Sequence, residues 1–152
     1  MPNTYTQLLY HIVFATRRRE PLVREKCEKR LHAYIGGIVR NEGGVLLAAG
    51  GMADHLHLVL RLGTTRAVAN VVRVVKSKSA AWMNELEDYP GKFYWQRGYS
   101  AFTLSKSQLD RVLNYVNRQK EHHQHRDFQQ ELRVLLAKHD VAFEEAYLWE
   151  WE

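Results

Sequence analysis

The sequence predicts an α+β fold in which a small antiparallel sheet is covered by helices. Several stretches are rich in β-branched, aromatic or alternating apolar residues, as strands are. Between and after them, apolar residues recur three and four positions apart, as they do on the buried side of a helix. Glycine- or proline-containing breaks separate these stretches, and the length of 152 residues predicts a single domain over residues 1–152.

The first strand is expected within residues 5–17, and the run from Arg17 to Pro21 breaks it. A helix follows from Leu22 to about Asn41, because apolar residues recur there at helical spacing. Two glycines close this helix, and residues 45–49 then form a short second strand.

Residues 50–54 are expected to turn the chain into a third strand, in which polar and apolar residues alternate over 55–62. A second helix is predicted over about residues 66–86, where a Tyr-Pro-Gly segment follows. The fourth strand lies within residues 93–104 and is interrupted near Gly98. Each crossover between strands is therefore either a tight turn or a helix.

Two further helices are expected at the C-terminal end. Residues 105–108 open the first of them, and the second runs from about Asp127 to His139. The order β-α-β-β-α-β that precedes them is that of a ferredoxin-like antiparallel sheet. In that arrangement the first and third strands are central and the two crossover helices cover one face. We expect the additional C-terminal helices to pack on the face that remains open.

Two histidines in the third strand are the most informative feature of the chain. His55 and His57 are two residues apart, so their side chains leave the sheet on the same face, opposite Leu56 and Leu58. Neutral imidazoles held side by side can share one divalent metal ion. The alternative is that they are two polar residues on a solvated sheet face.

A tyrosine and a glutamine four residues apart lie on the third helix. Tyr115 and Gln119 project from one side of it, one turn from each other. A tyrosine oxygen can act as a covalent nucleophile, and a glutamine oxygen can complete a metal site that two histidines begin. The alternative for Tyr115 is an aromatic residue at the edge of an apolar stripe, and the alternative for Gln119 is an exposed helix residue.

The charge distribution points to a polyanionic partner. All 22 lysines and arginines precede residue 140, whereas five of the 17 acidic residues lie at or after it, so residues 1–139 carry a formal charge of +10. A small domain with this excess favours nucleic acid. The candidate phosphate contacts are Arg17, Arg18, Arg19, Arg66, Arg73, Lys76 and Lys78. The alternative is that these side chains are solvated surface charges.

Three aromatic residues are candidates for contacts with the bases. Tyr94, Trp95 and Tyr99 either stack on unpaired bases or pack in the core.

Composition also bounds the environment of the protein. The single cysteine, Cys27, cannot form an internal disulfide, and the first residues do not have the layout of a signal peptide. No apolar run approaches the length needed to span a bilayer. We therefore expect a cytoplasmic protein without a membrane partner.

Several motifs together resemble one protein family, the single-tyrosine HUH transposases of bacterial insertion sequences and their REP-associated relatives. The resemblance is carried by residues 10–16, 51–54, His55-Leu56-His57, Tyr115 with Gln119, 121–123 and 147–150. It spans nearly the whole chain, and the order and spacing of these motifs make it more specific than any one of them.

The resemblance implies a metal-dependent enzyme that cleaves and rejoins single-stranded DNA at hairpin-bearing element ends. His55, His57 and Gln119 would hold Mg²⁺ or Mn²⁺, and Tyr115 would form a 5′-phosphotyrosine link. Relatives act as homodimers in which the tyrosine helix of one subunit serves the histidines of the other. The short connection at residues 105–108 agrees with this expectation, because it leaves the helix little freedom to fold over its own central strand.

Other classes of protein fit these motifs less well. A binuclear zinc hydrolase is excluded, because Leu58-Val59-Leu60 stand where such enzymes need Asp-His. A non-catalytic nucleic-acid-binding module or repressor on the same scaffold remains the alternative. The joint presence of His55, His57, Tyr115 and Gln119 favours the enzyme, because a pure binder needs no nucleophile one turn from an amide ligand.

Overall fold

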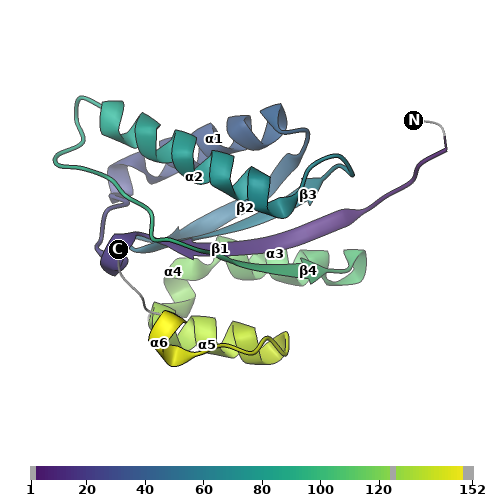
Figure 1. The fold of residues 1–152 in the computed structure, drawn as a ribbon. Helices are drawn as coiled ribbons and strands as arrows, with labels where there is room; N and C mark the ends of the chain where they lie inside the picture. The colour runs from purple at the N-terminus through teal and green to yellow at the C-terminus, as the bar shows by residue number, and fades with distance from the viewer. Residues whose placement is uncertain (1–2, 124–125, 149–152) are drawn as a thin grey trace.

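A four-stranded antiparallel sheet lies between two layers of helices in the computed structural model, which describes residues 3–123 and 126–148 (Figure 1). The sheet order is β2-β3-β1-β4, so the first and third strands are central as predicted. The strands are β1 (Leu8–Ala15), β2 (Val45–Met52), β3 (His55–Leu62) and β4 (Ser100–Leu104). The α+β, ferredoxin-like prediction is confirmed.

The helices divide between the two faces of the sheet (Figure 1). The crossover helices α1 (Glu25–Asn41) and α2 (Val68–Glu85) cover one face. The other face is covered by α3 (Leu109–Asn117), α4 (Gln119–His122) and α5 (Phe128–Lys138), with α6 (Glu145–Leu148) beside α5. Short 3₁₀ turns precede α1 and α3, at Arg17–Arg19 and Lys106–Gln108.

The main core lies between the sheet and α1 and α2. Leu56, Leu58 and Leu60 alternate onto this side of β3 and are each 1% exposed. They meet the apolar stripes of both helices, including Leu31 of α1 and Val71 of α2. Burying a leucine side chain stabilises a fold by about 1.5–3 kcal/mol. The leucine side of the alternating strand therefore carries much of the stability.

The histidine side of β3 is covered as completely as the leucine side. His55 is 1% and His57 0% exposed, because α3 and α5 pack over this face. The alternative in which the two histidines lie on a solvated sheet face is therefore wrong. The physical reason is that the apolar stripes of both helices need a surface to pack against, and Val59 and Val13 of the sheet supply it.

The second strand is longer than expected, because two glycines that resemble a turn belong to it. Gly50 pairs with His57 and Gly51 with Leu56, and β2 ends only at Met52. A Cβ on Gly50 would lie 2.0 Å from the backbone oxygen of Val116 in α3. Glycine in a strand often marks such a close approach of another backbone segment. The absence of a side chain here lets α3 lie against the sheet.

The end of the third helix also differs from the prediction. Helix α3 stops at Asn117, and Arg118 has φ −109° and ψ 28°, outside the helical region. Gln119 then begins the short helix α4. Tyr115 and Gln119 are therefore separated by a break rather than carried by one continuous helix.

The fourth strand is shorter than residues 93–104. Only Ser100–Leu104 pair with β1, while Trp95 forms an isolated bridge with Thr16.

Helix α5 begins after Asp127, where the sequence predicted its start. The Asp127 side chain caps the helix by accepting a hydrogen bond from the backbone N–H of Gln130. Within the described ranges no helix has the length and apolar character to span a bilayer.

Substitution of Gly50 tests the docking of α3 on β2. We expect Gly50→Ala to lower the free energy of unfolding by about 1–3 kcal/mol, because the new methyl group collides with the Val116 backbone. Gly37→Ala is the matched control, since a Cβ at Gly37 within α1 has no atom within 4 Å. It should be neutral or stabilising by up to about 1 kcal/mol. Urea denaturation of both variants measures the difference, and equal midpoints would contradict this packing.

Candidate active site

The two histidines of β3 are held by hydrogen bonds at their outer ring nitrogens. His55 Nδ1 lies 2.8 Å from Asp54 Oδ1, and His57 Nδ1 lies 2.8 Å from Nε2 of His11 on β1. Such partners fix the ring orientation and tautomer of a metal-binding histidine. The Nε2 atoms lie on the opposite side of the two rings and face α4 and α5.

Tyr115 and Gln119 reach the same space from the opposite side. Gln119 Oε1 lies 3.2 Å from His55 Nε2, and the Tyr115 ring meets His57 edge-on with 5.8 Å between the ring centroids. The Gln119 side chain is buried. All four residues predicted for the site are therefore brought together within one chain. The expectation that the short connection keeps this helix away from its own central strand is wrong, because α3 packs directly on β2 and β3.

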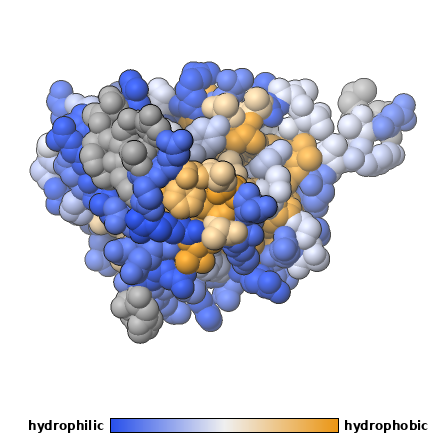
Figure 2. Space-filling model, turned by 60° about the horizontal axis from the view of Figure 1, so that its bottom comes forward, coloured by the Kyte–Doolittle hydropathy of each residue, from blue (hydrophilic) through white to orange (hydrophobic). Residues whose placement is uncertain are grey.

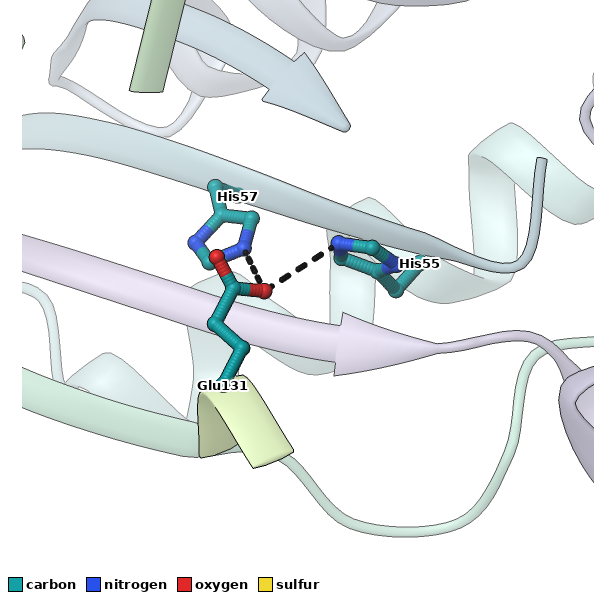
Figure 3. A group of neighbouring side chains, drawn as sticks. All are labelled: His55, His57 and Glu131. Atoms are coloured by element: carbon teal, nitrogen blue, oxygen red, sulfur yellow. Dashed lines mark hydrogen bonds and ion pairs between the residues drawn. The ribbon is translucent and has the colours of Figure 1, made fainter. Parts of the chain in front are cut away.

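Glu131 of α5 completes the cluster and was missed by the sequence analysis. Its Oε1 lies 3.0 Å from His57 Nε2 and 3.4 Å from His55 Nε2 (Figure 3). His123 Nε2 also lies 3.0 Å from this oxygen, while the hydroxyl of Tyr115 donates a hydrogen bond to Oε2. One carboxylate thus connects three imidazoles and the tyrosine.

A signal for Glu131 is present in the sequence. Phe128, Leu132 and Leu135 form the buried side of α5, and Glu131 lies on the same stripe. It is 1% exposed. A glutamate is almost never fully buried without a partner. A charged residue inside an apolar stripe therefore identifies a candidate functional position.

Burial and charge set the protonation of the cluster. Burial alone would raise the pKa of Glu131, but hydrogen bonds from His123, His55 and His57 outweigh it and hold this pKa well below its usual range. Burial would lower the pKa of His55, yet hydrogen bonds to Asp54 and Glu131 raise it to about 9. Burial lowers the pKa of His57 and brings that of His11 to about 3. The apoprotein thus holds an anionic Glu131 next to a His55 that favours its cationic form.

The tyrosine hydroxyl keeps its proton in this arrangement. Burial, followed by the negative charge of Glu131, raises the pKa of Tyr115 above its usual range. The hydrogen bond to Glu131 has the same effect, because it favours the neutral phenol. Ionisation of Tyr115 therefore requires a compensating positive charge nearby.

The donor atoms suit a divalent cation. His55, His57 and Glu131 each offer one ligand atom, and these atoms all lie within 4.8 Å of one another. Imidazole nitrogens with amide and carboxylate oxygens bind Mn²⁺ and related ions, and oxygen ligands suit Mg²⁺. The residues present therefore fit a divalent metal ion.

An open pocket leads to Tyr115 from the solvent. Its volume is about 670 Å³, and it is lined by Tyr115, Arg118, Glu121, His122, His123, Arg126 and Glu131. The His122 ring lies against the Tyr115 ring, with centroids 4.6 Å apart. Two arginines at this mouth are positioned to contact an anion approaching Tyr115, and the sequence analysis did not select them. His125, which follows in the chain, lies outside the described residues.

The basic residues selected from the sequence fall into two places. Arg17–Arg19 follow β1 beside the turn at Asp54, because the Thr16 N–H donates to the Asp54 carbonyl. The other four belong to α2 or the segment before it, on the face opposite the histidines: Arg66, Arg73, Lys76 and Lys78. Lys76 is already engaged, because its Nζ donates to the carbonyl oxygens of Gln96 and Gly98 at 2.6 and 2.7 Å.

The three aromatic residues of the 93–99 segment have different environments. Trp95 packs edge-on against Phe14 in the core, as the alternative predicted. Tyr94 is 38% exposed, and the guanidinium carbon of Arg17 lies over its ring, 4.2 Å from the ring centroid. Tyr99 is 41% exposed. Only the two tyrosines therefore remain accessible to a ligand.

The fold thus carries two histidines, a glutamine and a glutamate that are buried next to a half-buried tyrosine, and sequence comparison identifies the class of protein that has this fold. The family model described as "Transposase IS200 like" matches residues 4–119. The chain therefore belongs to the IS200-like transposase family, whose members cleave DNA. The family also implies a divalent metal, which the donor set above suits.

Individual relatives support the same assignment. The transposase for insertion sequence element IS200 of Salmonella typhimurium is 29% identical over 131 residues, covering 80% of this chain and 82% of the relative. The ISDra2 transposase TnpA of Deinococcus radiodurans is 24% identical over 118 residues, covering 74% and 84%. Both alignments include most of each protein.

Solved structures show the same fold. A crystal structure at 1.90 Å of a chain assigned as a transposase from Deinococcus radiodurans R1 superposes with a TM-score of 0.60 and 22% identity, covering 75% of this chain and 92% of that one. The REP-associated tyrosine transposase bound to a REP hairpin gives a TM-score of 0.56 and 14% identity, covering 75% and 67%. Because the sequence identities are low, these two superpositions show a shared fold only.

Proposed function

We propose that this transposase cleaves and rejoins single-stranded DNA at hairpin-bearing ends through a 5′-phosphotyrosine intermediate on Tyr115. The observation that carries the proposal is the convergence of Tyr115 with His55, His57 and Gln119 in one buried cluster that opens to solvent at the tyrosine. A covalent nucleophile next to a metal-binding set is the arrangement that phosphoryl transfer requires. A non-catalytic DNA-binding module would not need it.

His55, His57 and Gln119 would hold a Mg²⁺ or Mn²⁺ ion, which supplies positive charge to the scissile phosphate when bound. Asp54 and His11 orient the two imidazoles through their Nδ1 atoms. Burial lowers the pKa of His57, which favours the neutral imidazole that a metal ion needs. The residues of this chain thus prepare the site before DNA arrives.

Tyr115 performs the cleavage. Its oxygen attacks the phosphorus, the bond from phosphorus to the 3′ oxygen breaks, and the DNA 5′ end stays linked to the tyrosine. The tyrosine proton passes to solvent and the departing 3′ oxygen gains a proton, leaving a free 3′-hydroxyl. A 3′-hydroxyl can attack the phosphotyrosine in turn, so the bond energy is conserved and no nucleotide cofactor is needed. To attack, Tyr115 must exchange its hydrogen bond with Glu131 for the phosphate.

Arginines at the pocket supply contacts to the DNA backbone. Arg118 and Arg126 line the mouth next to Tyr115, and Arg17–Arg19 lie at the end of the sheet that carries Asp54. We propose that these residues hold the strand being cut, and that the exposed Tyr94 and Tyr99 stack on unpaired bases. A hairpin is the proposed recognition element, since a structural relative binds a REP hairpin. The α2 set from the sequence remains a second proposed contact region.

A homodimer is the proposed assembly. The side of the molecule formed by α3 and α5 carries an apolar patch surrounded by hydrophilic residues (Figure 2). Partly buried apolar side chains of β2, β4 and α3 contribute to the surface there: Leu47, Leu104, Val112 and Leu113. Contiguous apolar patches on a protein surface mark interaction sites. A second copy packing there would bring two tyrosine helices close together.

Loss of the tyrosine hydroxyl tests the proposed nucleophile. We expect Tyr115→Phe to bind a hairpin oligonucleotide with unchanged affinity but to form no covalent adduct in the presence of Mn²⁺. A denaturing gel with labelled DNA measures both the adduct and the free cleaved strand. Tyr99→Phe is the matched control and should form the adduct normally. An adduct that persists in Tyr115→Phe would assign the nucleophile to another tyrosine, and no adduct with any protein would favour the non-catalytic module.

Salt dependence identifies the face that binds DNA. For single-stranded DNA the logarithm of affinity falls with the logarithm of salt by about 0.7 for each neutralised phosphate. We expect the double variant Arg118→Ala, Arg126→Ala to flatten this slope by roughly that amount per lost contact. The pair Arg73→Ala, Lys78→Ala is the control on α2. If only the α2 pair flattens the slope, the DNA lies on the face predicted from the sequence.

Mixing inactive variants distinguishes a shared site from a site within one chain. Tyr115→Phe and His57→Asn should each be inactive alone, and circular dichroism should verify that both are folded. If the tyrosine serves the partner subunit, exchange of subunits restores a fraction of the cleavage, because a heterodimer contains one intact site. Because Tyr115 lies beside His57 and Glu131 of its own chain, we expect no recovery even after confirmed exchange. Recovery would show that the tyrosine serves the partner subunit and would contradict this geometry.

A further inference from the structure

Glu131 is a buried ionisable side chain of the cluster to which the proposed reaction gives no role. It belongs to α5, beyond the residues 4–119 that match the family. We propose that Glu131 is an additional ligand of the divalent metal ion in this protein, through Oε1, while Oε2 holds the Tyr115 hydroxyl. This inference rests on the proposed metal site at His55, His57 and Gln119 and adds a negative charge to it.

The distances between donor atoms favour ligation. Glu131 Oε1 lies 3.0 Å from His57 Nε2 and 3.4 Å from His55 Nε2, and Gln119 Oε1 lies 3.2 Å from His55 Nε2. Neighbouring ligands in an octahedral shell with bonds of about 2.1 Å are about 3 Å apart. These three distances are therefore close to the spacing of neighbouring ligands of one ion.

The carboxylate is held in place by its surroundings. Phe128, one turn before Glu131, stacks on the His55 ring with centroids 4.4 Å apart. His123 Nε2 lies 3.0 Å from Oε1, within hydrogen-bonding distance. Asp127 caps the helix at its start. A ligand whose position is fixed before binding loses little conformational entropy when the ion arrives.

A different role for the carboxylate makes the opposite prediction. If Glu131 only accepts hydrogen bonds from protonated histidines, it competes with the ion for their nitrogens, and removing its charge should strengthen metal binding. If Glu131 is a ligand, removing its charge should weaken binding. The sign of the change therefore separates the two roles.

Titration of the full-length protein with MnCl₂ in the absence of DNA tests the proposal. Isothermal titration calorimetry should give a Kd for Glu131→Gln about 10–100-fold weaker than for the wild type, at least the loss seen when outer partners of metal ligands are removed. Glu131→Asp should also bind more weakly, because its shorter side chain keeps the charge but does not reach the histidines. Glu121→Gln is the matched control, since Glu121 lines the same pocket but its side chain is 70% exposed, and its Kd should be unchanged.

A measurement on the wild type keeps the test valid if the variants do not fold. In a crystal soaked with Mn²⁺, located by its anomalous signal, Glu131 Oε1 should lie within about 2.4 Å of the ion, the reach of a bonded oxygen. Unchanged or tighter binding by Glu131→Gln, or an ion more than 3 Å from this oxygen, would overturn the proposal. If His57→Asn leaves Mn²⁺ binding unaffected, the underlying metal site is wrong, and that failure is separate from the failure of Glu131.

Discussion

The carboxylate of Glu131, surrounded by three imidazoles, connects the C-terminal helices to the centre of the sheet. It is 1% exposed, and its oxygens contact His55, His57, His123 and Tyr115. Removing one partner of a buried ion pair costs about 3–5 kcal/mol, because the other charge is left uncompensated. The position of α5, the orientation of the tyrosine and the protonation of both central histidines all depend on this cluster.

The two faces of the sheet divide stability from chemistry. Leucines of β3 pack against α1 and α2, while the histidines between them contact Tyr115 of α3, Gln119 of α4 and Glu131 of α5. Because side chains of a strand alternate, a polar cluster is built on one face without opening the core on the other. Gly50 allows α3 to approach closely enough for Tyr115 to reach the histidines.

The site is enclosed at the histidines and open at the tyrosine. Gln119 and the ring nitrogens are buried, whereas the pocket lined by Arg118, His122 and Arg126 meets the solvent next to Tyr115. In a low-dielectric environment the interactions of the buried groups are stronger than in water. The arrangement suits a large substrate that presents one phosphate to a prepared interior.

The sequence by itself determined the strand order, the common face of His55 and His57, the start of α5 and the family, because each follows from periodicity or spacing along the chain. It did not determine the strand at Gly50, the break at Arg118, the burial of the histidines or the contacts of Glu131. Only the tertiary structure decided these, because they depend on how α3 and α5 pack on the sheet. A glutamate in an apolar stripe is recognisable in the sequence, but its two partners on β3, His57 and His55, lie 74 and 76 positions away and meet it only when the helix docks.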